Sequence, residues 1–148
     1  MKTLITKLTA TQAGWSALAL RLPIGIIFAA HGAQKLFGWF GGYGLEGTAG
    51  WMDSIGLSPG MLMALLAGAA EFFGGLALII GLLTRPAAAA LAVAMLVAIF
   101  AVHFENGLFM ANNGYEFGLA LLAASVSLLF SGAGKLSVDE LLAKRLNS

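Results

Sequence analysis

Four long apolar segments alternate with short polar or glycine-rich stretches along the chain, at residues 15–39, 60–83, 87–104 and 115–130. Their lengths are close to the roughly 20 residues that a helix needs to cross the hydrocarbon core of a bilayer. Successive helices joined by short connections pack as antiparallel neighbours. The pattern therefore predicts an all-α, polytopic membrane protein, in which residues 1–148 form one domain built as an antiparallel four-transmembrane-helix bundle.

Three connections join these segments. The first, at residues 40–59, is rich in glycine, and we expect a short interfacial helix near residues 48–55 and Ser58 as the N-cap of the second segment. Thr84-Arg85-Pro86 predicts a very tight second connection, because Pro86 can end one helix and begin the next. A polar turn at residues 105–114 makes the third connection.

The distribution of basic residues predicts how the chain crosses the membrane, since Lys and Arg are enriched in cytoplasmic loops. Lys35 is the basic residue on one side of the predicted bundle, and the others lie on the opposite side: Lys2, Lys7, Arg21, Arg85, Lys135, Lys144 and Arg145. We therefore expect both termini to be cytoplasmic, with a tail over residues 131–148. Within the tail, Ser137 is a typical N-cap for a C-terminal amphipathic helix over residues 138–146.

Composition agrees with a membrane protein: 59% of the 148 residues are hydrophobic and 10% are charged. The net charge of +1 gives no basic face for nucleic acid. The absence of cysteine excludes thiol redox chemistry, disulfides and cysteine-ligated metal in this chain. The first apolar segment is too long for a signal-peptide core and carries Arg21, so we expect it to be retained as a span.

Ionisable residues inside the predicted spans are the candidates for function: His31, Lys35, Glu71, His103 and Glu116. Such residues are costly in hydrocarbon and usually face a protein interior or a wet cavity. At about 1.5 Å per residue, His31 and Glu71 both fall near the midplane of adjacent helices. We interpret the set as ligand-binding or proton-relay residues that line a pocket.

A structural interpretation of the same residues stays open. Lys35 could form a buried ion pair with Glu71 or Glu116 that fixes helix register, with His31 as an interior hydrogen-bonding residue. Arg21 is interpreted as a snorkelling residue at the interface, where its aliphatic stem is buried and its charge stays in water. Arg85 is interpreted as a topology charge.

The spacing of the candidates also bears on cofactors. His31 and His103 lie at different predicted depths, which argues against a bis-histidine haem. The Glu-x-x-His pairs of di-metal bundles do not occur, nor does any zinc spacing. We therefore expect no metal site and no intrinsic cofactor.

Several short motifs together resemble the DoxX-like membrane proteins over about residues 20–139: Arg21 with His31-Gly32-Ala33-Gln34-Lys35, Ala70-Glu71-Phe72-Phe73-Gly74-Gly75, Gly81-Leu82-Leu83-Thr84-Arg85, Tyr115-Glu116-Phe117 and Gly132-Ala133-Gly134-Lys135-Leu136-Ser137-Val138-Asp139. The resemblance implies a four-span protein of the bacterial inner (cytoplasmic) membrane. It also implies association with redox systems, because the family takes its name from a subunit associated with thiosulfate:quinone oxidoreductase and a terminal quinol oxidase.

The leading hypothesis is a membrane subunit of an oxidoreductase system that binds a quinone or similar small apolar molecule. His31 and Lys35 would then donate hydrogen bonds to a carbonyl oxygen of the ligand. One alternative is a non-enzymatic scaffold that anchors a soluble redox or detoxification partner, and a second is a small-solute permease. Whether the chain is itself catalytic, which protein is its partner and whether it forms a homo-oligomer all stay open.

Overall fold

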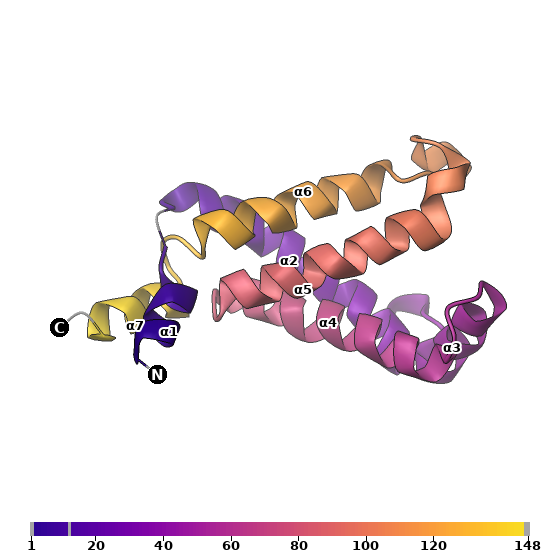
Figure 1. Cartoon of the computed structure of the whole chain (residues 1–148), viewed down its shortest axis with the longest axis horizontal. Helices are drawn as coiled ribbons and strands as arrows, with labels where there is room; N and C mark the ends of the chain where they lie inside the picture. Colours follow the sequence, from indigo (N-terminus) through magenta and orange to yellow (C-terminus); the bar gives the residue numbers. More distant parts are fainter. Residues whose placement is uncertain (1, 12, 147–148) are drawn as a thin grey trace.

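The computed structural model describes residues 2–11 and 13–146, and every regular element within these ranges is a helix (Figure 1). The α-helices are α1 (Lys2–Thr9), α2 (Trp15–Phe37), α3 (Gly44–Ser54), α4 (Gly60–Ile80), α5 (Thr84–Ala98), α6 (Glu116–Ser131) and α7 (Val138–Leu146). Short helical turns lie between them: η1 (Trp39–Gly41), η2 (Ile99–His103), η3 (Phe104–Asn106) and η4 (Met110–Asn112).

Three helices in the described ranges are long and apolar enough to cross a membrane: Trp15–Phe37, Gly60–Ile80 and Thr84–Asn106. The third comprises α5 and the two turns that continue it, the π-helical η2 and the 3-10 turn η3. The fourth predicted span is the shorter apolar helix α6, whose 16 residues measure about 24 Å. The predicted all-helical class is therefore confirmed, and three of the four predicted spans have the length of a membrane-crossing helix.

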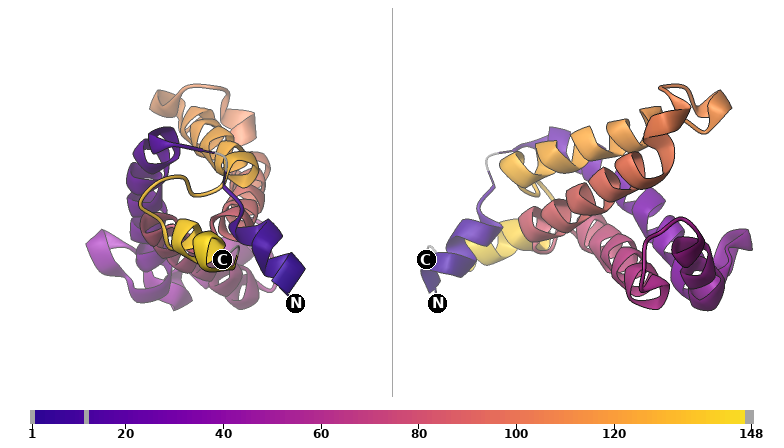
Figure 2. Two further views of the ribbon diagram at one scale, coloured as in Figure 1. Left: turned by 90° about the vertical axis from the view of Figure 1, so that its left-hand side faces the viewer. Right: turned by 45° about the vertical axis from the view of Figure 1, so that its right-hand side comes forward.

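The helices form two diverging halves. α2 packs along α4, and α6 packs along α5. The tight turn between α4 and α5 holds the halves together near the termini, where α1 contacts α7 (Figure 1). Toward the opposite end the α5–α6 pair separates from α2, α3 and α4 (Figure 2).

Glycines allow the close contact between α2 and α4. A Cβ atom at Gly25 would lie 2.7 Å from the backbone oxygen of Gly75, and one at Gly32 would overlap the backbone of Phe72. A Cβ atom at Gly75 would likewise overlap the backbone of Ala29. Small residues of α2 therefore face α4, where such residues permit backbones to approach.

Some helix ends have the capping residues that the sequence predicts, and one does not. α2 ends at Gly38 and α4 at Gly81, both in the left-handed conformation that glycine adopts without strain. Ser137 caps α7 as predicted, because its Oγ accepts the Glu140 amide at 3.1 Å. The prediction that Ser58 caps α4 is wrong. The α3 residue Asp53 accepts the Gly60 amide at 2.8 Å instead, and the hydroxyl of Ser58 donates to the same carboxylate.

Arg21 is completely buried, which differs from the expected snorkelling position. Its guanidinium donates to five backbone oxygens, at Leu78, Ile79, Ala133, Lys135 and Leu136. These oxygens belong to the end of α4 and to the segment before α7. Arg21 therefore joins α2 to α4 and to the C-terminal segment.

Arg85 also makes structural contacts. Its guanidinium donates to the backbone oxygen of Ala10 at 3.0 Å and to that of Leu129 at 2.8 Å. It thereby links the start of α5 to the N-terminal segment and to the end of α6.

Candidate functional site

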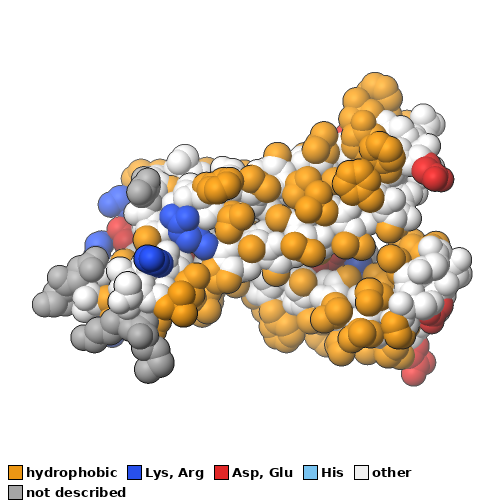
Figure 3. Space-filling model, in the orientation of Figure 1, with side chains coloured by type: hydrophobic (Ala, Val, Ile, Leu, Met, Phe, Trp, Pro, Cys, Tyr) orange, Lys and Arg blue, Asp and Glu red, His pale blue; other side chains and the backbone are white. Residues whose placement is uncertain are grey.

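A cavity of about 670 Å³ lies where the two halves diverge. Its walls come from α2, α3, α4, α5 and α6 and from the turn at residues 110–114. Figure 3 shows the molecule hollowed between the α5–α6 half and the α3–α4 half, with charged side chains at the floor of the hollow. The walls are mainly apolar, and the ionisable residues that line them are His31, Lys35, Glu71 and His103.

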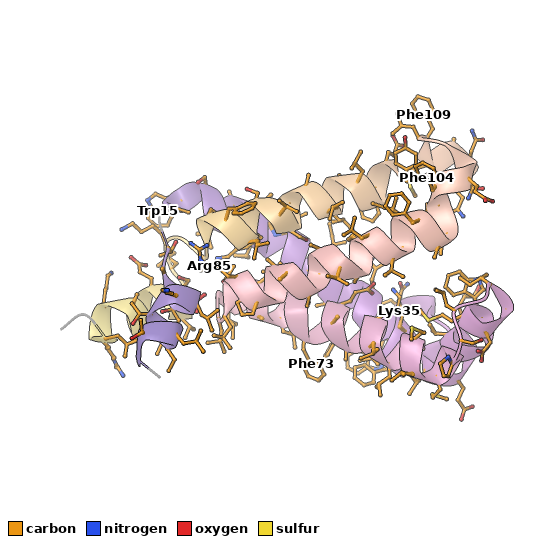
Figure 4. The ribbon with its side chains drawn as sticks, in the orientation of Figure 1. Trp15, Lys35, Phe73, Arg85, Phe104 and Phe109 are labelled. Atoms are coloured by element: carbon orange, nitrogen blue, oxygen red, sulfur yellow. The ribbon has the colours of Figure 1, made fainter. Side chains whose placement is uncertain are left out.

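An ion pair between Lys35 of α2 and Glu71 of α4 forms the charged part of the cavity. Lys35 Nζ lies 2.5 Å from Glu71 Oε2, and the Glu71 side chain is only 5% exposed. Figure 4 shows Lys35 in the space between α5 and the α3–α4 region, whereas Phe73 on the other face of α4 points away. The pair is one of the two that the structural interpretation of the sequence left open, Lys35 with Glu71 or with Glu116, and its two charges are opposite.

The two histidines are held by hydrogen bonds to the backbone. His31 Nδ1 lies 3.0 Å from the backbone oxygen of Ile27, one turn earlier in α2. His103 Nδ1 lies 2.9 Å from the backbone oxygen of Asn113 in the turn before α6. His103 is the last residue of the π-helical turn η2, and such turns are frequent at functional sites.

Glu116 does not line the cavity. Its carboxylate accepts the backbone amide of Met110 at 2.6 Å, so it holds the turn that precedes α6. The part of α6 that faces the cavity carries Phe117, Gly118 and Leu121.

Small residues of α5 line the cavity: Ala90, Ala94 and Ala98 recur every fourth residue along its wall. Their small side chains leave volume that larger residues would fill. Leu66 of α4 and Val93 and Val97 of α5 line the cavity and are exposed, and the hollow between these parts is open in Figure 3. The cavity therefore opens sideways, between α4 and α5, onto the apolar surface of the molecule.

Some lining residues were not among the sequence candidates. Trp51 and Met52 of α3 and Met110 of η4 all contribute to the wall, although they lie in the predicted connections. An aromatic residue in a connection is more often an interfacial anchor, so its type alone did not distinguish the two roles. No group of three or more metal-ligating side chains occurs among residues 2–11 and 13–146.

Comparison with known families gives an independent result. The DoxX family model matches residues 16–104, which is more than half of the chain. The chain belongs to the DoxX family. The matched region includes all four ionisable residues of the cavity, whereas Glu116 and α7 lie outside it. The family resemblance seen in the sequence is thus confirmed.

Relatives of this DoxX protein are similar over most of their length. A Bacillus subtilis (strain 168) protein named "Putative oxidoreductase CatD" is 35% identical over 86% of this chain and 87% of its own. A Mycobacterium tuberculosis protein named "Uncharacterized membrane protein Rv3486" is 31% identical over 88% of this chain and 83% of its own. The Escherichia coli (strain K12) "Inner membrane protein YqjF" is 34% identical over 86% of this chain and 92% of its own. No solved structure matches the chain.

Proposed function

We propose that this DoxX protein is a membrane subunit of an oxidoreductase system and binds a quinone in the cavity between its two halves. In this proposal α2, α4, α5 with its continuation and α6 cross the bacterial inner membrane as a four-span bundle, with both termini in the cytoplasm. Local thinning of the bilayer accommodates a helix as short as α6. Two relatives, one named as an oxidoreductase and one as an inner membrane protein, agree with this assignment.

The observation that carries the proposal is an apolar cavity with an ion pair and two histidines in its wall. A small-molecule site is typically an apolar cavity in which a few polar groups fix the orientation of the ligand. A quinone matches this arrangement, since it has an apolar ring and two polar oxygens. Lys35 has N–H donors beyond the one that Glu71 accepts, and these are available to a ligand oxygen.

The opening between α4 and α5 favours a ligand that is dissolved in the bilayer. Leu66 and Val93 line the cavity and are respectively 56% and 61% exposed. In a membrane these surfaces face lipid tails, so an apolar ligand reaches the cavity without crossing water. An apolar tail on the ligand would extend through the same opening into the lipid.

Binding of decylubiquinone to the purified protein in phospholipid nanodiscs tests the proposal. We expect saturable binding to the wild type and at least tenfold weaker binding to Lys35→Ala, which removes the ammonium donor to a quinone oxygen. Ser127→Ala on α6 is the matched control, because Ser127 is exposed away from the cavity. Absence of saturable binding to the wild type would rule the proposal out.

The ion pair also supports the alternative of a scaffold, because it joins α2 to α4. If packing is its only role, the double variant Lys35→Met with Glu71→Gln should fold and still support the activity of a partner protein. If the cavity binds a ligand, the double variant should fold and lose that binding.

A further inference from the structure

The two histidines of the cavity use the same ring nitrogen to contact the backbone. Nδ1 of His31 faces the carbonyl oxygen of Ile27, and Nδ1 of His103 faces that of Asn113. A carbonyl oxygen can only accept a hydrogen bond, so both Nδ1 atoms carry the proton. In a neutral imidazole the other nitrogen, Nε2, is then an acceptor. A ligand that meets either neutral ring at Nε2 must therefore donate, which corrects the expectation that His31 donates to a carbonyl oxygen of the ligand.

The other two ionisable groups of the cavity, Glu71 and Lys35, also bear on whether a ligand must donate or accept a hydrogen bond. The Glu71 carboxylate can only accept, and it already accepts from Lys35. Lys35 donates, but the oxygen of a hydroxyl and the oxygen of a carbonyl both accept from an ammonium group. Lys35 therefore does not distinguish a hydroxyl from a carbonyl, whereas the histidines and Glu71 do.

We infer that the cavity binds the reduced, dihydroxy form of its quinone ligand more tightly than the oxidised, dicarbonyl form. The inference rests on the proposed function and specifies which redox state the site selects. A hydroquinone hydroxyl donates to a histidine Nε2 and still accepts from Lys35. A quinone carbonyl accepts from Lys35 and leaves the histidine acceptors without a partner.

The expected preference is about tenfold, the net value of roughly one hydrogen bond. Because the couple transfers two electrons, a tenfold difference in affinity raises the midpoint potential of the bound couple by about 30 mV. A quinone in this cavity is then easier to reduce than the same quinone in the bilayer. The site therefore suits a subunit that holds the product of quinone reduction or supplies the substrate for quinol oxidation.

The test compares both redox forms on the same protein, so folding does not differ between the two measurements. The dissociation constants of decylubiquinone and decylubiquinol are measured anaerobically at pH 8 in phosphatidylcholine nanodiscs. We expect decylubiquinol to bind about tenfold more tightly. His103→Gln and His31→Gln each add an amide N–H donor and should reduce the preference toward unity.

Equal binding of the two forms, or tighter binding of decylubiquinone, would overturn the inference and leave the proposed function standing. An unchanged preference in both glutamine variants would also overturn it, because the histidine acceptors would then not be its source. Absence of binding by either form would overturn the proposed function itself.

Discussion

Lys35 and Glu71 show how one contact can serve both packing and binding. Removing two charges from water is expensive, and a buried ion pair often stabilises less than an apolar pair of the same size. Here the pair lies in a cavity wall, with Glu71 almost buried and Lys35 partly exposed. It supplies polar groups to the cavity at no net charge. An uncharged ligand is therefore a better match than an anion or a cation.

Arg21 gives the sharpest prediction for stability. Arg21→Lys keeps the charge but loses the planar fork that reaches five carbonyl oxygens, so we expect a loss of about 3 kcal/mol in the free energy of unfolding. Arg85→Lys should cost about 1 kcal/mol, because Arg85 donates to two carbonyl oxygens and is only partly buried. Thermal unfolding in detergent measures both, and equal losses would contradict this account.

Asp53 lies outside the membrane-spanning helices, and its hydrogen bonds should make the stability of the protein depend on pH. Hydrogen bonds from Ser58 and from the Gly60 amide lower the pKa of the Asp53 carboxyl. A lowered pKa in the folded state means that the contribution to stability is present above the unfolded pKa and is lost as pH falls through the folded pKa. Asp53→Ala should therefore flatten the fall in thermal stability as the pH is lowered below about 4, the ordinary pKa of an aspartate. A slope identical to that of the wild type would contradict the assignment.

At single residues the sequence predicted some contacts and missed others for a physical reason. Helical rise on two adjacent segments placed His31 and Glu71 at similar depth. The ion pair that forms there is Lys35–Glu71, one of the two alternatives that the sequence left open. The burial of Arg21 did not follow, because a basic residue near the end of a span can either reach water or satisfy backbone carbonyls. The carbonyls of Ala133, Lys135 and Leu136 that decide the outcome lie far along the chain.

Among the elements, the α2–α4 contact depends on glycine. We expect Gly32→Ala to separate the helices and to weaken the Lys35–Glu71 pair, because its Cβ would overlap the backbone of Phe72. The expected cost is about 2 to 3 kcal/mol, typical of an overpacked contact, with loss of ligand binding. Gly50→Ala in α3 is the control, since nothing lies within 4 Å of its new Cβ.

Gly50→Ala should be neutral or stabilising by up to about 1 kcal/mol, because alanine is the better helix former. Thermal unfolding and decylubiquinone binding of the two variants provide the comparison. Equal effects of the two substitutions would show that the helices do not depend on close approach at Gly32.

Hydropathy with glycine and proline signals predicted the helices to within a few residues of their ends. The predicted connection Thr84-Arg85-Pro86 is wrong, because these residues form the first turn of α5 and the chain turns at residues 81–83. The predicted first span at residues 15–39 ends two residues early, at Phe37, and the predicted tail helix matches α7. The π-helical turn at Ile99–His103 was not predicted. Hydropathy does not distinguish an α-helical turn from a π-helical one, because both present the same apolar residues.

For the molecule as a whole, the proposed topology places both termini on one side of the membrane and Asn112 on the other. The chain contains no cysteine, so single cysteines report position directly. A membrane-impermeant maleimide should label Asn112→Cys in intact cells and Thr3→Cys only after permeabilisation. Both residues are exposed. The reverse pattern would show that the orientation is opposite.

The divergence of the two halves creates the cavity, and its occupancy is the central claim. Native mass spectrometry of gently purified protein tests this claim directly, with two variants of α5. Ala94→Trp fills the cavity, whereas Leu96→Trp is the control because Leu96 is 43% exposed and does not line it. We predict that the wild type and Leu96→Trp retain a lipid-soluble quinone and that Ala94→Trp does not. A wild type without bound ligand, or equal retention by Ala94→Trp, would contradict the account.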